Sequence, residues 1–178
     1  MCIRDSFNVN QFYEKHHGGN KIEQLRNEFL EKYDFILIDS RTGLTDFGGI
    51  CTIHFPDILI LLFTPTEQSL EGVIDVAKKA VSAQMNLPYD REKLLTFPVP
   101  TRVDSNTEFQ ITQDWIKRFA NELDFAYNDW VPTAISKKDF IESIKIPYIP
   151  FFSYGEQLPV VIQGINDKSG LGLSLIHI

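Results

Sequence analysis

The segment from Tyr33 to Gly43, with the sequence YDFILIDSRTG, constrains the fold of this chain more than any other feature. Four apolar residues, 35–38, run without interruption into Asp39, and a turn containing Gly43 follows at once. Such an apolar run is typical of a parallel strand that is buried on both faces. In open α/β sheets, ligands bind outside the carboxyl ends of the strands. The sequence therefore predicts a ligand-binding carboxylate, Asp39, at the edge of a parallel sheet.

Predicted helices and strands alternate along the whole chain. Apolar residues at helical spacing predict helices at 21–32, 67–85 and 107–127. Short apolar runs predict strands at 35–39, 58–64, 94–99 and 146–152. We expect Asn20 to cap the first helix, and Pro98 and Pro100 to end the third strand. Strands that alternate with helices imply a parallel sheet covered on both faces. The predicted fold class is therefore α/β, a three-layer sandwich with a mostly parallel sheet.

The two ends of the chain read as translated adapter DNA. Residues 1–6 (MCIRDS) can be encoded by ATGTGTATAAGAGACAG, and the reverse complement of that DNA translates as LSLIHI, which is residues 173–178. One oligonucleotide read on opposite strands explains both hexamers, and it resembles a transposase-type sequencing adapter. We therefore expect residues 7–172 to be an internal part of a longer protein, and we leave both hexamers out of the fold prediction.

Charge and cysteine content limit the classes of function. The formal net charge of the 178 residues is −7, which argues against a strong general affinity for nucleic acid. Without residues 1–6, Cys51 is the only cysteine, so no internal disulfide is possible and a reducing, cytoplasmic compartment is expected. The longest apolar run, 58–63, is too short to span a bilayer.

Four places, in the right order, make the chain resemble the ParA/MinD-type family of P-loop ATPases. The resemblance covers most of residues 29–172. The four places are IDSRTG (38–43), LLFTPTEQSLEG (61–72), PTR (100–102), and PYIP (147–150) followed by GEQLPV (155–160). Two of them depart from the family, which usually has a Pro-Pro turn after the first of these strands and an Asn-Arg pair in place of Thr101-Arg102. The SRTG form further resembles a subgroup of large bacterial proteins in which the ATPase is joined to TIR or tetratricopeptide modules.

The resemblance implies a P-loop NTPase-like fold and a switch that binds ATP and magnesium. It implies slow ATP hydrolysis that converts a homodimer into monomers. Asp39 would orient the magnesium shell through a water molecule, as the family's Walker B residue does. The residues implied near the γ-phosphate are Arg41, Thr42 and Gly43. The residues implied near the adenine base are Arg102, Pro150, Gly155 and Glu156.

The sequence contains no Gly-rich loop followed by Lys and Ser/Thr. In the family, that phosphate-binding loop and the first switch Asp lie on strands that precede the matching part of this chain. The resemblance therefore implies a C-terminal fragment whose N-terminal strands are missing. We expect this fragment alone to be inactive.

Other interpretations of single residues stay open. Asp39 is also a common turn former after a strand, and Arg41 is also placed to form a surface ion pair with Asp46. Arg102 either caps a strand end or lies over the base. Cys51 and His54 have the spacing of two zinc ligands but no second pair, which favours a helix carrying an ordinary buried cysteine.

Two other functional classes remain. A non-catalytic regulatory or scaffold module of a multidomain signalling or defence protein would keep the fold without hydrolysis. The altered SRTG turn and the altered base motif fit that alternative. A flavodoxin-like or receiver-type signalling domain would need an acidic pair after the first strand and a Lys after the last, and the sequence has neither.

Overall fold

The computed structural model describes residues 12–13, 15, 17–40, 49–104, 109–153 and 161–162. The chain divides into two compact units. Unit 1 comprises residues 1–59 and 78–94, and unit 2 comprises residues 60–77 and 95–178. Among the described residues, no helix has the length and apolar character needed to cross a membrane.

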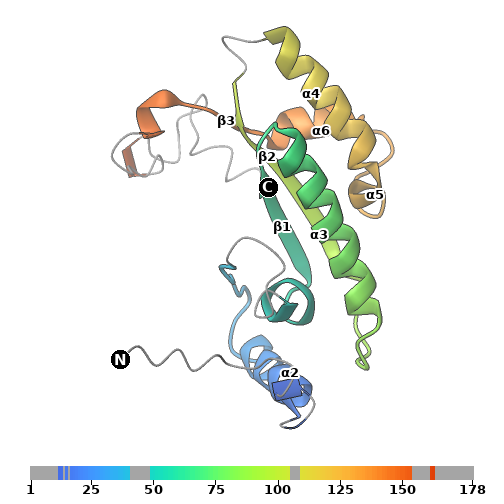
Figure 1. The fold of residues 1–178 in the computed structure, drawn as a ribbon. Coiled ribbons are helices and arrows are strands. Elements are labelled where there is room, and N and C mark those ends of the chain that lie inside the picture. The colour runs from blue at the N-terminus through green and yellow to red at the C-terminus, as the bar shows by residue number, and fades with distance from the viewer. Residues whose placement is uncertain are drawn as a thin grey trace, which may run out of the picture. The chain divides into compact units, whose positions relative to one another are not determined.

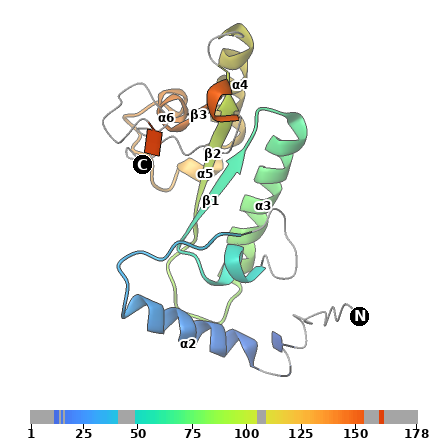
Figure 2. The ribbon, with the colours of Figure 1, turned by 90° about the vertical axis from the view of Figure 1, so that its left-hand side faces the viewer.

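The described chain is an α/β structure with a small open sheet of three parallel strands (Figure 1). The strands are β1 (Ile58–Phe63), β2 (Leu95–Val103) and β3 (Ile146–Pro147), in the order β1-β2-β3. The helices along this part of the chain are α3 (Glu67–Met85), α4 (Phe109–Glu122), α5 (Asp124–Tyr127), α6 (Lys137–Ile144) and the 3-10 turn η2 (Pro150–Ser153). In Figure 2, β1 points upward and turns at its carboxyl end into α3, which runs back alongside the strand.

An apolar core holds unit 2 together. Phe63 at the end of β1 contacts Phe119 of α4 edge to face, with ring centroids 5.0 Å apart. Phe97 of β2 packs in the same way on Trp130, at 4.9 Å. The other buried members of the core are Leu70, Val73, Val99, Ile116, Leu123, Tyr127, Val131, Ile141 and Ile144. Because such burial contributes about 25 cal/mol per Å² of apolar surface, this cluster stabilises the unit.

Strand β2 runs through the two prolines that we expected to end it. Pro98 and Pro100 are both fully buried within the strand. The pairing with β3 starts only at Thr101, which lies opposite Ile146. At the prolines, β2 therefore lacks its β3 neighbour, and a missing backbone N–H is tolerated there. The expected strand at 146–152 is shorter than predicted for a related reason, because the chain turns into η2 at Pro150, where the first helical turn favours proline.

The expected helix at 107–127 is interrupted. The described helix α4 ends at Glu122, Leu123 leaves helical geometry (φ −100°, ψ 6°), and α5 restarts at Asp124. The restart places the hydroxyl of Tyr127 within 2.5 Å of the carbonyl oxygen of Pro98, to which it donates a hydrogen bond. This bond satisfies a buried carbonyl group, so it links the interrupted helix directly to β2.

Unit 1 contains the helix α2 (Gly18–Leu30), the π-helical turn η1 (Ile50–His54), the last turns of α3 and the segment 86–94. Helix α2 begins after His17, not at Asn20 as expected. Gly18 is needed at this start because a Cβ atom there would lie 2.3 Å from the ring of Phe12. The segment 86–94 is tied back to α3 by Gln84, whose side-chain oxygen accepts the N–H of Leu94 at 2.8 Å.

The predicted strand at 35–39 is wrong. The backbone there is irregular and belongs to no strand, and the side chains of Phe35 and Leu37 are 90% and 95% exposed. A β-strand needs a neighbour to satisfy its backbone N–H and C=O groups. Within the described residues, no strand pairs with this segment, so its apolar side chains gain no burial.

The sheet is also not covered on both faces throughout. Residues 96–100 of β2 are all buried, as expected of a strand between two layers. In β1, by contrast, Ile58, Ile60 and Leu62 are more than half exposed, whereas Leu59 and Phe63 are buried. The described residues thus show an α/β sheet with one bare strand face, and a complete third layer remains a proposal.

Candidate functional site

The carboxyl end of β1 is followed by a tightly bonded turn. The hydroxyl of Ser69 accepts the N–H of Thr64 at 3.1 Å. In return, the hydroxyl of Thr66 accepts the N–H of Ser69 at 3.3 Å, so Thr66 caps the start of α3. Together with Pro65, these bonds hold the first backbone N–H groups of α3 at the carboxyl edge of the sheet. The amino end of a helix carries partial positive charge, which suits an anionic ligand.

Two charged side chains fix this helix start to its neighbour. The guanidinium group of Arg118 in α4 pairs with Glu67, the first residue of α3, and with Glu122. The hydrogen bond from Arg118 lowers the pKa of Glu67. The same guanidinium lies over the ring of Trp115, 5.1 Å from its centroid. Because both carboxylates are well exposed, this contact orients α3 and α4 more than it stabilises them.

The carboxyl end of β2 carries the strained residue of the site. Arg102 has a φ of 56°, in the left-handed region that a residue with a Cβ atom rarely adopts. Its side chain is exposed. The neighbouring Thr101 donates its hydroxyl hydrogen to the carbonyl oxygen of Phe63 at 3.0 Å, and so ties the ends of β2 and β1 together. Backbone strain of this kind costs about 1–2 kcal/mol and concentrates at ligand sites.

The chain after β3 returns to the same place. The backbone N–H of Tyr148 donates to the carbonyl oxygen of Val103 at 3.1 Å. Pro150, two residues later, opens η2 and is exposed. The structure therefore brings Arg102 and the segment leading to Pro150 to one end of the sheet. Thr101, Ser69 and Tyr148 were missed by the sequence analysis, because a backbone-directed hydroxyl or N–H has no sequence pattern of its own.

Of the remaining predicted site residues, the structure describes only Asp39. Asp39 belongs to unit 1, where it lies exposed at the end of the irregular segment 35–40. Arg41, Thr42, Gly43, Gly155 and Glu156 lie outside the described residues. Cys51 lies in η1, as the ordinary-cysteine interpretation predicted, although it is only partly buried.

The described residues do not by themselves fit a magnesium or zinc ion. No group of three or more His, Cys, Asp or Glu side chains in the described ranges is placed to hold a metal. Asp39 is a single carboxylate with an exposed side chain, and magnesium is usually held by one or two carboxylates together with phosphate oxygens and water. A magnesium site would therefore need groups beyond those that the structure describes, and we derive no catalytic step through the metal.

Comparison of the chain with protein-family models, curated proteins and solved structures finds no match. The resemblance to the ParA/MinD-type ATPases therefore rests on the four sequence motifs.

Proposed function

We propose that this chain carries part of an ATP-binding domain of the ParA/MinD type, which acts in the intact protein as a nucleotide-dependent switch. One observation carries the proposal. Three of the four resembling motifs fall at the carboxyl ends of three successive parallel strands, in the segments 64–69, 100–102 and 147–150. In an open parallel sheet this is the edge where ligands bind.

The chemistry of that edge supports a nucleotide. It combines the start of helix α3, whose partial positive charge suits phosphate, with the exposed guanidinium of Arg102, which suits a base or an anion. The two parts are held together by the bond from Thr101 to Phe63, so the edge is organised before a ligand arrives. Pre-organisation of this kind lowers the entropic cost of binding.

Asp39 provides the sharpest test of the ATPase proposal. In the intact protein, Asp39→Asn keeps the shape of the side chain and removes the charge that would orient the magnesium shell. We expect ATP turnover to fall by about tenfold to a thousandfold, at 1.4 kcal/mol for each tenfold change. Thermal melting should not change, because the side chain is exposed.

The matched control is Asp34→Asn, an exposed aspartate at the other end of the same segment. Steady-state hydrolysis and a thermal melt should be measured for wild type and both variants. Equal turnover in all three proteins would show that Asp39 is only a turn residue and would contradict the proposal.

The second candidate is the non-catalytic regulatory or scaffold module. It is favoured by the altered SRTG turn and the altered base motif, and by the exposed position of Asp39. Whether or not the module binds nucleotide, this candidate predicts that the wild-type intact protein does not hydrolyse ATP. The same hydrolysis measurement therefore separates the two candidates.

A further inference from the structure

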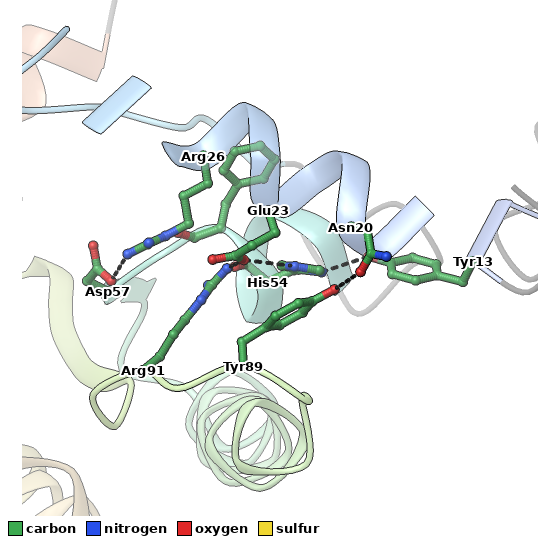
Figure 3. Close-up of polar contacts among 9 residues, drawn as sticks. Tyr13, Asn20, Glu23, Arg26, His54, Asp57, Tyr89 and Arg91 are labelled. Atoms are coloured by element: carbon green, nitrogen blue, oxygen red, sulfur yellow. Dashed lines mark hydrogen bonds and ion pairs between the residues drawn. The ribbon is translucent and has the colours of Figure 1, made fainter. Parts of the chain in front are cut away.

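A polar cluster in unit 1 is built around a buried histidine (Figure 3). The side chain of His54 in η1 is 2% exposed. Its ring lies between those of Tyr13, with centroids 6.1 Å apart, and Tyr89, with centroids 5.3 Å apart. The cluster thus joins three segments of unit 1 that are distant in sequence. Neither the fold of unit 2 nor the proposed nucleotide edge makes use of it.

Both ring nitrogens of His54 face polar groups. The hydroxyl of Tyr13 lies 3.2 Å from Nδ1, and a carboxylate oxygen of Glu23 lies 3.5 Å from Nε2. A single neutral tautomer fits both contacts: Nε2–H faces the carboxylate without forming a hydrogen bond to it, and Nδ1 accepts the hydrogen of the Tyr13 hydroxyl. The backbone of the same residue is held as well, because the guanidinium of Arg91 donates to the carbonyl oxygen of His54.

The charges around the ring balance only while His54 is neutral. Glu23 of α2 pairs with Arg91 of the segment 86–94, and their side chains are 19% and 8% exposed. Arg26, also in α2, donates to the carbonyl oxygen of Phe55 at 3.2 Å and pairs with Asp57. The two carboxylates are thus already matched by two guanidinium groups. A proton on His54 would add a positive charge near Arg91 and Arg26, and the described carboxylate that faces the ring, that of Glu23, already pairs with Arg91.

We propose that His54, Glu23 and Arg91 form a pH-sensitive latch that holds α2 on η1 and the segment 86–94 while His54 is neutral, and releases it when His54 gains a proton. The latch adds a pH response to unit 1 that is independent of the proposed nucleotide site. Among the described residues, the other titratable groups around the cluster are Tyr13, Tyr89, Arg26 and Asp57 (Figure 3).

The direction of the response follows from the free energy of protonation. Burial lowers the pKa of His54 from its ordinary value of 6.5, and nearby Arg26 lowers it further. Below pH 6.5, the unfolded form of unit 1 therefore binds a proton that the folded form does not. Stability is complete above pH 6.5 and is lost as the pH falls toward the lowered pKa. Carboxylates titrate mainly below pH 5.5, so the response between pH 7.5 and 5.5 isolates the histidine.

Hydrogen exchange tests the latch on the chain as printed. The opening equilibrium of the α2 amides, corrected for intrinsic exchange, should increase between pH 7.5 and 5.5, by at most about tenfold. Tenfold is the limit for a group whose unfolded pKa is 6.5 and whose folded form stays neutral over the whole range. Amides of α4 in unit 2 serve as the internal reference. His54→Gln should abolish the increase.

His17→Asn is the matched control, because His17 is an exposed histidine next to the same helix and asparagine tolerates its φ of 52°. This variant should keep the wild-type increase. A wild-type chain with no change, or a His54→Gln variant with the wild-type change, would overturn the proposal.

A second measurement decides the matter even if His54→Gln does not fold. The chain has four histidines, so a variant with His16, His17 and His177 replaced by asparagine keeps His54 as the single imidazole. Its NMR titration should give a pKa below 6.5. A pKa at or above 6.5 would overturn the latch.

Discussion

Strands β1 and β2 are neighbours in one sheet, yet they are buried very differently. Every residue from 96 to 100 in β2 is buried, whereas the alternate residues Ile58, Ile60 and Leu62 of β1 are more than half exposed. The exposed strand, β1, has the more apolar sequence of the two, so composition does not explain the difference. The packing on the faces of the strands does, because α5 and α6 pack on β2, whereas nothing in the described residues covers the face of β1 that carries Ile58, Ile60 and Leu62.

This difference shows where the described structure is complete and where it is open. The core around β2 satisfies its own backbone and buries its own side chains. The exposed face and edge of β1 are unusual for a soluble sheet, since exposed apolar strands promote association. Under the proposed function, further strands of an ATPase sheet would cover them.

The largest expected effect comes from placing a charge on each strand in turn. Val99 of β2 is 1% exposed, and Leu62 of β1 is 65% exposed. Val99→Asp buries an unpaired carboxylate, so we expect a loss of roughly 3–5 kcal/mol in the free energy of unfolding. Leu62→Asp should change it by less than about 0.5 kcal/mol. Urea unfolding followed by Trp115 and Trp130 fluorescence checks both variants.

Equal losses for these two variants would mean that β1 is covered in solution, which would remove the contrast between the strands. A loss for Leu62→Asp that appears only in a longer form of the protein would instead locate the cover outside residues 1–178.

A smaller effect is expected from the hydrogen bond that ties α5 to β2. Tyr127→Phe removes the donor to the carbonyl oxygen of Pro98 and leaves that buried oxygen without its partner. The expected loss is about 1–2 kcal/mol in the free energy of unfolding. Burial also raises the pKa of Tyr127, so alkaline titration of this hydroxyl should require unfolding.

The control for Tyr127→Phe is Tyr33→Phe, since Tyr33 is 58% exposed. That variant should unfold like wild type. If Tyr127→Phe also unfolds like wild type, the bond to Pro98 contributes nothing net, and packing alone links α5 to β2.

Periodicity predicted the elements whose stability is local. Helix α3 begins at Glu67 and ends at Met85, as expected, because its apolar face and its Thr66 cap both lie within a short stretch of sequence. The segment 35–39 was predicted wrongly because a strand also depends on a partner, and the sequence of one strand does not show whether a partner is present. Pro98 and Pro100 were wrongly expected to end β2 for the same reason, because the sequence does not show where the neighbouring strand β3 begins to pair.

The candidate site was predictable only in part. Arg102 and Pro150 could be named from the motifs at the ends of predicted strands. The positive φ of Arg102 and the hydrogen bond from Thr101 to Phe63 could not, because they depend on tertiary contacts. The cluster around His54 was not predicted, although His54 itself was considered as a zinc ligand. Several of its members are distant in sequence, as the separation of 37 positions between His54 and Arg91 illustrates.

Arg102→Gly gives the most direct test of the central claim, that the carboxyl edge of the unit 2 sheet binds a nucleotide. Glycine adopts a φ of 56° without strain, so the variant should melt at the wild-type temperature or slightly above it. In the intact protein, calorimetric titration with ATP and magnesium should show an affinity about tenfold lower than wild type, or about 1.4 kcal/mol. The charge control is Lys117→Gln, because Lys117 lies in α4, where glycine would weaken the helix. This variant should bind ATP like wild type. Unchanged ATP affinity in Arg102→Gly, with its fold intact, would contradict the claim.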